Sequence, residues 1–539
     1  MPETSKSVAA RTDTSESAPQ ETAPPAARQP VAAASPDTAQ VRQIAISTEK
    51  YRAVVSSRGA LLQECELKDY VTSDGDPVRL LPNGGEGMGL LVGPGGKEID
   101  LRQRVFSVSA PDDRYTLTGK DSVALAFTYV LPTGKQLYKR YTFYGNTYTV
   151  RFSSGFADSL YSERVVLLWE GEVPHAEGDF QRSVGHMRAE AYVGGSLEKF
   201  QVKDKPDSSA VTGQTDWVGV RNKYFLTAFA PSGIERWSVK LRGRGASSLF
   251  VNYGWRITPD DITQSHIEGT LYLGPIDVDI LKSAGHNLDQ AADMGWAIIR
   301  PISTLILWFF LAMYKLIPNY GWVIIIFSVV VKIVLHPLTK KSYESTSKMQ
   351  KLKPLMDELR QKYKNDQQRL NQEMLKLYKE QGFNPLGGCL PMLLQMPIFF
   401  AIYAVIGNNI EFRQAGFIWW ITDLSVPDVI YTLPFHLPIY GQHVTILPVL
   451  MAISMFIQQK LTLTDPKQKM LIYLMPFIML FVFNNLSSGL VLYWFMFNIL
   501  SSAHQYWLTQ RQKAQTDAAE GKLAPAPVVV KNPTKRRKR

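Results

Sequence analysis

The stretch "WVIIIFSVVVKIVLHPL" (residues 322–338) decides the fold of this chain, because it is almost entirely apolar yet carries the charge of Lys332. It predicts a membrane helix over 319–338, close to the roughly 20 residues that cross a bilayer. A charge at the bilayer centre costs about 2.5–3.5 kcal/mol on the most lenient scale, so such a residue usually faces a bundle interior or water. The alternative is a lysine stem that extends toward the membrane surface, since Lys340 follows about 12 Å further along the helix.

Other apolar runs approach the same length, and they lie at 297–317, 388–410, 445–462, 469–486 and 488–507. In lipid a helix satisfies its own backbone hydrogen bonds, so the sequence from 319 onward predicts an α-helical bundle of five membrane spans. The run 297–317 contains Arg300, Pro301 and Lys315, which favours an amphipathic helix on the membrane surface over 286–317. A sixth span at 297–317 is the alternative, and it would leave the preceding domain in the cytosol.

Lys and Arg are concentrated in three segments of the helical half, and this bias predicts its orientation. They are the connection 340–384, the short loop "TDPKQK" (464–469) and the tail that ends "KRRKR", whereas the loop 411–444 has only Arg413. We therefore expect these basic segments in the cytosol and the N-terminal domain on the opposite face of the membrane.

The connection 341–383 has apolar residues at helical spacing on both sides of "KND" (364–366). This pattern predicts a cytosolic helical hairpin with Asn365 or Asp366 as a helix cap. The apolar positions are Met349, Leu352, Leu355, Met356, Leu359 and Tyr363 in the first arm, and Leu370, Met374, Leu377 and Tyr378 in the second. A net-basic hairpin suits contact with a ribosome or with anionic lipids; a solvated connector is the alternative.

The N-terminal half of this 539-residue chain of net charge +11 has a different composition. Residues 1–45 are rich in Ala, Pro, Ser and Thr, which predicts a disordered linker. Residues 46–285 contain β-branched and aromatic runs separated by turn residues, including 132–134 and 144–146. Such runs predict an all-β sandwich, and the basic residues 511–539 form a cytosolic tail.

No sequence motif for catalysis or for a cofactor is found. The two cysteines, Cys65 and Cys389, lie in different halves, so we expect no disulfide framework and no cysteine-based metal site. Four histidines of the β-region are scattered in sequence, which favours surface or core positions over a sugar-modifying site; they are His175, His186, His266 and His286.

Several segments of the helical half carry a specific resemblance. "NPLGGCLPMLLQMPIFFAIY" (384–403) is similar to the hallmark segment of the YidC family of membrane-protein insertases. The similarity continues at "HPLTKKSYESTSKMQKLKP" (336–354), "EFRQAGFIWWITDLS" (411–425) and "SSGLVLYWFMFNILSSAHQ" (487–505). It covers about 318–510, and the β-region resembles the periplasmic domain of Gram-negative members in size and place.

The resemblance implies a protein that inserts and helps fold newly made membrane proteins, alone or with the Sec translocon and with ribosomes as partners. It implies no catalysis, no cofactor, no metal and no sequence-specific binding of nucleic acid. The core helices of the family enclose a hydrophilic groove. Gram-negative members begin with a membrane span ahead of the β-domain, and we expect that anchor to be missing from this chain.

The resemblance also implies site residues. Lys332 stands where the family carries a basic residue, usually Arg, and Ser328 lies one turn earlier. Positions that form an apolar slide for substrates in the family are Met396, Phe399, Tyr493 and Trp494. Polar residues within apolar spans add groove candidates, namely Gln395, Asn498 and Gln505. Ordinary packing is the alternative for each, and a small-solute transporter or channel with a sugar-binding β-domain is the alternative function.

Overall fold

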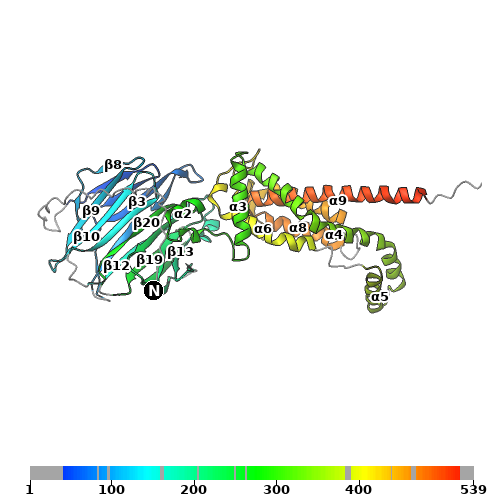
Figure 1. The fold of residues 1–539 in the computed structure, drawn as a ribbon, viewed down its shortest axis with the longest axis horizontal. Helices are drawn as coiled ribbons and strands as arrows, with labels where there is room; N and C mark the ends of the chain where they lie inside the picture. The colour runs from blue at the N-terminus through cyan, green and yellow to red at the C-terminus, as the bar shows by residue number, and fades with distance from the viewer. Residues whose placement is uncertain are drawn as a thin grey trace, which may run out of the picture.

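The computed structural model describes residues 40–81, 84–93, 97–157, 163–202, 206–247, 250–261, 264–382, 390–438, 440–462 and 469–522. The described chain forms an N-terminal β-domain and a C-terminal helical bundle, which lie end to end (Figure 1). Most of the predicted linker 1–45, the loop around 464–468 and the end of the basic tail lie outside the described residues.

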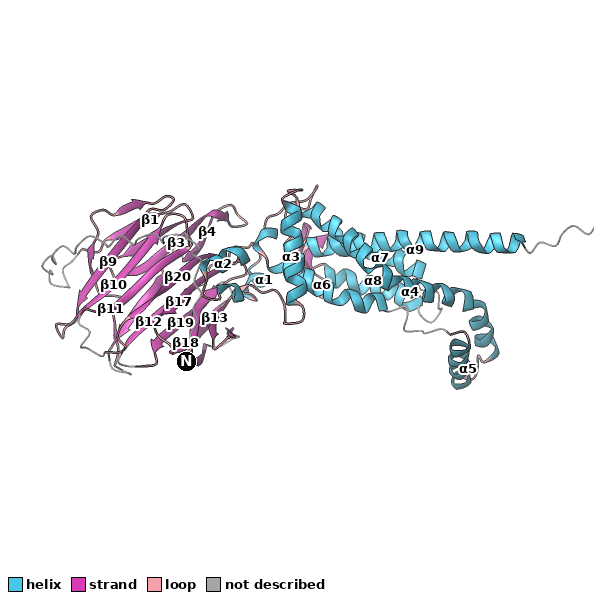
Figure 2. Cartoon of the chain, in the orientation of Figure 1, coloured by secondary structure: helices cyan, strands magenta, loops and turns pink. Residues whose placement is uncertain are grey.

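Two large sheets form the β-domain, which confirms the predicted β-sandwich (Figure 2). In pairing order the first sheet contains β15 (Asp207–Gly213), β18 (Trp237–Ser247), β19 (Phe250–Pro259), β12 (Val165–Glu172), β5 (Glu86–Val92), β3 (Leu61–Val71), β2 (Tyr51–Ser56), β1 (Gln43–Ser47) and β8 (Arg114–Thr116), with β4 (Pro77–Leu81) beside β3 and β6 (Ile99–Asp100) beside β5. The second contains β14 (Ser196–Phe200), β13 (Arg188–Val193), β16 (Thr215–Arg221), β17 (Phe225–Ser232), β20 (Ile267–Pro275), β11 (Thr149–Phe156), β10 (Gln136–Tyr144), β9 (Ser122–Val130) and β7 (Ser107–Ser109).

Strand β10 shows how the sequence produces this sandwich. Its residues alternate between buried and more exposed positions, as a strand with one face on a core requires. The turn at 132–134 joins it to antiparallel β9, and Gly134 there has a φ of 80°, which favours glycine. Lys139 occupies a buried position of this strand, and its ammonium group donates to the carbonyl oxygens of Gly59, Ala60 and Met88 at 2.9, 2.7 and 2.6 Å. These three bonds offset the cost of burying a polar group.

Aromatic side chains fill the space between the two sheets. Trp255 of the first sheet stacks on Phe229 of the second, with ring centroids 6.2 Å apart, and on Trp169 at 6.4 Å. Trp217 and Trp237 are fully buried as well. Strand β1 begins at Gln43, three residues before the expected start of the domain at residue 46, and it pairs antiparallel with β2.

The helical half contains the predicted apolar helices. They are α3 (Arg300–Tyr314), α4 (Tyr320–Lys362), α6 (Leu390–Asn408), α7 (Leu447–Thr462), α8 (Lys469–Phe483) and α9 (Ser488–Lys522). The remaining elements are α1 (Phe180–Val184), α2 (Val278–Ala284), α5 (Gln367–Glu380), the 3-10 helices η1 (Leu288–Ala291) and η3 (Ile410–Phe412), and the hairpin β21 (Val429–Leu437) and β22 (Gly441–Thr445).

By length and composition, one helix of the described chain is apolar enough to span a membrane, with its most apolar window at Tyr320–Pro337. Shorter apolar helices lie at Arg300–Tyr314, Leu393–Asn408, Leu447–Leu461 and Ile472–Phe483. The outward faces of the bundle are apolar: Ile333, Tyr473 and Phe477 are between 59 and 67% exposed. A large exposed apolar surface of this kind is typical of a lipid contact.

Helix α4 differs from the predicted arrangement, since one continuous helix of 43 residues includes both the candidate span and the first arm of the hairpin. Pro337 and Pro354 lie inside it. Each proline removes only one backbone hydrogen bond, so a long helix can curve through it without ending. The hairpin itself forms, because Leu352 and Met356 of α4 pack against Leu370 and Met374 of α5.

Asp366 is the residue that caps α5, accepting a hydrogen bond from the backbone N–H of Arg369 at 2.9 Å. Leu355 was expected to face the other arm, but it is 43% exposed. The reason is the helical period, since Leu352, Met356 and Leu359 already occupy the contact stripe and Leu355 lies beside it.

Helix α3 runs crosswise between the β-domain and the bundle (Figure 1). One of its faces is buried through Ile306, Leu307 and Phe310, whereas Leu305 and Trp308 are 64 and 66% exposed. The helix therefore caps the bundle with one apolar face and leaves a second apolar face uncovered.

The β-domain is joined to the bundle through Arg413, a residue of the loop after η3 that is 8% exposed. Its guanidinium donates to Glu177 at 2.7 Å and to the carbonyl oxygens of Val71 and Ala176 at 2.5 and 3.2 Å. The neighbouring Gln414 donates to Val71 as well, at 3.2 Å. Arg413 and Gln414 thus link a loop of the bundle to the end of β3 in the first sheet.

Candidate functional site

Lys332 points from α4 toward α9. Its ammonium group donates to the hydroxyl of Ser501 at 2.8 Å and lies 5.1 Å from the centre of the Phe497 ring. The adjacent Ile333 and Val334 face outward and are 67 and 62% exposed. Of the two alternatives for Lys332, the contacts with α9 favour a charge that faces the bundle.

Ser328 lies one turn before Lys332 and is fully buried. Its hydroxyl donates to the carbonyl oxygen of Ile324 in the same helix at 2.8 Å. This back-bond is a common way for a serine to satisfy itself inside a helix. Ser328 therefore adds polarity to the face that carries Lys332, and the described contacts do not tie it to another helix.

Polar side chains from three other helices are also buried in the bundle. Asn498 of α9 donates to the hydroxyl of Ser454 in α7 at 3.2 Å. Gln395 of α6 and Gln505 of α9 are 7 and 4% exposed. Among the described residues, the Nε2 of Gln395 and the Oε1 of Gln505 have no hydrogen-bond partner. A buried unpaired amide group is costly, which makes these two positions suited to water or to a polar ligand.

The expected apolar slide separates into two groups. Phe399 and Trp494 pack edge to face at 5.0 Å, and both contact Phe483 of α8. Tyr493, by contrast, is fully buried and packs against Phe327 of α4 at 6.0 Å. Met396 is half-buried on α6. The structure thus brings Phe399 and Trp494 together and places Tyr493 beside α4.

Phe497 and Ser501, which contact Lys332, were not among the predicted site residues. Phe497 and Ser501 follow Tyr493 at intervals of four, and this spacing on one helical face could have revealed them. His336 lies one turn after Lys332, and its ring centroid is 4.9 Å from that of His504. Lys332 and His336 of α4, together with Ser501 and His504 of α9, thus form a strip of polar residues where the two helices meet. We call it the polar strip.

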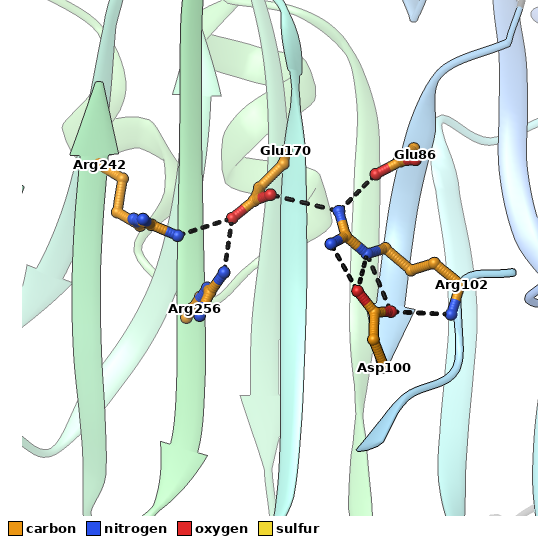
Figure 3. A network of polar contacts seen from close by, with 6 residues as sticks. All are labelled: Glu86, Asp100, Arg102, Glu170, Arg242 and Arg256. Atoms are coloured by element: carbon orange, nitrogen blue, oxygen red, sulfur yellow. Dashed lines mark hydrogen bonds and ion pairs between the residues drawn. The ribbon is translucent and has the colours of Figure 1, made fainter. Parts of the chain in front are cut away.

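The β-domain has an open cleft of about 890 Å³ whose floor carries an ion-pair network. Figure 3 shows Glu170 between Arg102 on one side and Arg242 and Arg256 on the other. Arg242 and Arg256 each donate to Glu170 at 2.9 Å, and Arg102 donates at 3.2 Å. Burial acts to raise the pKa of Glu170, and the three guanidinium groups bring this pKa below its ordinary value.

The candidate histidines do not gather at this cleft, since none of its described lining residues is a histidine. His266 instead contacts the hydroxyl of Tyr138 at 2.7 Å, and His175 contacts the carbonyl oxygen of Glu177. Within the described chain no cluster of three or more His, Cys, Asp or Glu side chains is arranged to hold a metal ion. The described residues of the β-domain therefore provide no histidine–carboxylate pair in the cleft for sugar chemistry.

Comparison with known proteins identifies the relatives of this chain. Residues 312–516 match the family described as 60Kd inner membrane protein, and residues 43–309 match the YidC periplasmic domain. The chain is 36% identical over 523 residues to the membrane protein insertase YidC of Prosthecochloris aestuarii, covering 92% of this chain and 89% of that protein. It is 37% identical over 496 residues to the YidC of Chlorobaculum tepidum, with coverages of 88 and 83%.

The chain belongs to the YidC family. Among solved structures, an active YidC insertase with its first transmembrane domain resolved shares 20% identity, covers 86% of this chain and 92% of that one, and has a TM-score of 0.38. A putative aldose 1-epimerase from Escherichia coli K12 shares 9% identity over 43% of this chain and 99% of that one, with a TM-score of 0.28. Family membership confirms the resemblance found in the sequence, whereas the roles of Lys332 and of the slide residues stay predictions.

Proposed function

We propose that this YidC-family chain is a membrane-protein insertase, which places newly made proteins in the bacterial inner membrane and helps them fold. The observation that carries the proposal is the similarity to insertases named YidC over nearly the whole chain, at 36% identity. This similarity favours the insertase over the transporter, and we propose that the protein acts without catalysis or a cofactor.

The polar strip between α4 and α9 is our candidate for the path of the substrate's polar segment. The charge of Lys332 attracts acidic residues of a translocated segment, and the buried amides of Gln395, Asn498 and Gln505 replace part of its water shell. A lysine offers a compact charge without the planar fork of arginine, so it attracts a carboxylate without holding it in one geometry. Such a weak site suits a segment that must move on.

The aromatic pair Phe399 and Trp494 is our candidate for the surface along which the apolar segment leaves toward lipid. Both rings are half-buried, so they combine fixed packing with accessible area. Met396, one turn before Phe399, adds a flexible side chain that adapts to different substrates. Tyr493 is fully enclosed, and we propose that it supports α4 next to Lys332 and does not contact the substrate directly.

We further propose a periplasmic β-domain, a cytosolic hairpin and α3 on the periplasmic membrane surface. The β-domain and α5 lie at opposite ends of the bundle, which supports this topology (Figure 2). The exposed apolar residues Leu305 and Trp308 of crosswise α3 suit insertion into the interface. Nascent membrane proteins, ribosomes, the Sec translocon and anionic lipids are the partners that we propose from the family and from the basic hairpin.

The proposal is tested by insertion into liposomes that contain the purified protein. Ribosomes translate a single-span client with an acidic translocated tail, and client protected from protease is measured against empty liposomes. We expect protection with the native chain, a loss with Lys332→Met, and near-native protection with Lys332→Arg. Lys315→Met removes an exposed lysine after α3 and is the matched control. Equal protection by Lys332→Met would remove the charge from the mechanism, and no protection above empty liposomes would refute the insertase.

A further inference from the structure

A second cavity lies where the β-domain meets the bundle, and its lining residues include none from the polar strip or from the cleft around Glu170. Its volume is about 1030 Å³. The β-domain contributes one wall through Glu177, Arg182 and Lys223, and the bundle contributes the other through the end of α6 and the loops that follow it. The cavity is therefore lined by parts of the chain that are distant in sequence.

The face of α6 that carries the slide candidates leads into this cavity. Met396, Phe399, Tyr403 and Gly407 follow one another at spacings of three and four, which places them along one helical face. The last two line the cavity, and Tyr403 is 47% exposed. A segment that moves along this face toward the β-domain would reach the cavity next.

Gly407 marks open space in the cavity wall. A side-chain carbon added at this glycine would meet no atom within 4 Å. The glycine is part of the helix α6, so its backbone needs no unusual conformation. The helix backbone is thus accessible from the cavity at this point, and larger residues at 407 would fill the space.

The walls contain polar groups of both signs and an unpaired acceptor. Arg182 and Lys223 line the cavity from the β-domain, and Asp423 and Asp428 line it from the bundle. Asp428 is 5% exposed, and its Oδ2 accepts from the indole of Trp420 at 2.9 Å and from the backbone N–H of Leu447 at 2.7 Å. Its Oδ1 has no hydrogen-bond partner among the described residues. An unpaired buried acceptor favours an incoming donor such as a peptide N–H group.

We propose that this cavity receives the translocated segment of a client as an extended polar peptide, before that segment is released outside the membrane. Walls of mixed charge suit a polypeptide with both acidic and basic residues, and they suit a purely anionic ligand less well. The aromatic rings of Tyr403 and Trp420 add contact area that does not depend on the client's sequence. This inference rests on the proposed insertase function.

The test combines crosslinking and insertion on the same client in liposomes that contain the full chain. A photoreactive phenylalanine analogue replaces Tyr403, and the matched control replaces Tyr431, which is 59% exposed on β21 and does not line the cavity. Ribosome-bound intermediates of increasing length carry an epitope in the translocated segment. We expect crosslinks from position 403 to that segment at intermediate lengths, and at least tenfold fewer from position 431.

Filling the cavity gives a second readout. Gly407→Phe occupies the open space and is expected to reduce protected client several-fold, whereas Gly407→Ala keeps the space and is expected to leave protection unchanged. If clients are inserted but position 403 crosslinks only to lipid or to nothing, the cavity proposal is overturned and the insertase stands. If no client is protected above empty liposomes, both are overturned.

Discussion

Replacing Arg413 by methionine should weaken the junction between the β-domain and the bundle more than any surface ion pair could. The native Arg413 side chain is 3% exposed, pairs with a Glu177 side chain that is 14% exposed, and donates to two backbone carbonyl groups. It also lies 5.6 Å from the centre of the Phe225 ring. Methionine keeps much of the volume and removes every one of these polar contacts.

The magnitude follows from what the substitution leaves behind. Removing one partner of a buried ion pair typically costs about 3–5 kcal/mol, because the remaining charge stays buried without compensation. At about 1.4 kcal/mol for each factor of ten, the open junction should become roughly 140- to 3,700-fold more populated. Glu177→Gln combined with Arg413→Met removes both charges, so the double variant should cost less than the sum of the two single variants.

Hydrogen–deuterium exchange of the full chain in lipid measures this opening. The N–H of Ser73 donates to Ala176 at 3.3 Å, so peptides around both residues report on the junction. We expect their exchange to accelerate by about the factor given above, while peptides from β17 and β20 remain protected. The matched control is Arg42→Met, which breaks an ion pair with Asp113 whose side chains are 34 and 61% exposed. An exposed pair of this kind contributes about 0–1 kcal/mol. Unchanged exchange at the junction in Arg413→Met would refute the reasoning.

Two further predictions concern the β-domain and the hairpin. Burial, reinforced by Lys223 and Arg221, lowers the pKa of His186 from 6.5 to about 4, so the unfolded chain binds the additional proton between these values. The stability that neutral His186 contributes is complete above pH 6.5 and decreases as the pH falls, by about 2 kcal/mol between pH 7 and 5. Urea unfolding followed by tryptophan fluorescence should show this slope, and His186→Gln should flatten it; equal slopes would contradict the assignment. Asp366→Ala should destabilise the start of α5 by about 1 kcal/mol, seen as faster exchange there, with Asn365→Ala as the unaffected control.

Much of this architecture could be predicted from local pattern. The alternation in β10, the turn at 132–134 and the helical spacing around Leu352 and Leu370 each depend on neighbouring residues, and each appears in the structure as predicted. The continuity of α4 could not be predicted in this way. A proline lowers the preference for helix at its own position, but packing against α5 and α9 determines whether the helix actually ends.

The junction between the β-domain and the bundle could not be predicted for a different reason. Arg413 contacts Glu177 and Val71, which lie 236 and 342 residues away in the sequence. The residues next to it in the sequence do not distinguish it from a solvated loop arginine. In the sequence it stands out only as the single Lys or Arg residue of the loop 411–444. The hairpin β21–β22 in the same loop was not predicted either. Most residues of β21 are exposed, and they form no periodic apolar pattern.

The contacts of Lys332 explain why a charge interrupts the apolar stretch 322–338. In helix α4, Ile333 and Val334 point outward and Lys332 points toward α9. The lipid-facing and the polar surface therefore lie on different sides of the same helical turn. Helix α9 meets Lys332 with Ser501. Asn498, Ser501 and Gln505 interrupt the apolar run of α9, and all three are buried. A helix with such a sequence is less stable alone in lipid than an apolar one, and its bonds to α4 through Ser501 and to α7 through Asn498 offset part of that cost. The polar strip is thus both a condition for the two helices to stand together in a membrane and the candidate path for a polar client segment. Methionine keeps much of the lysine's volume and removes a charge that is costly in lipid, so Lys332→Met should impair insertion while leaving the fold of the bundle intact.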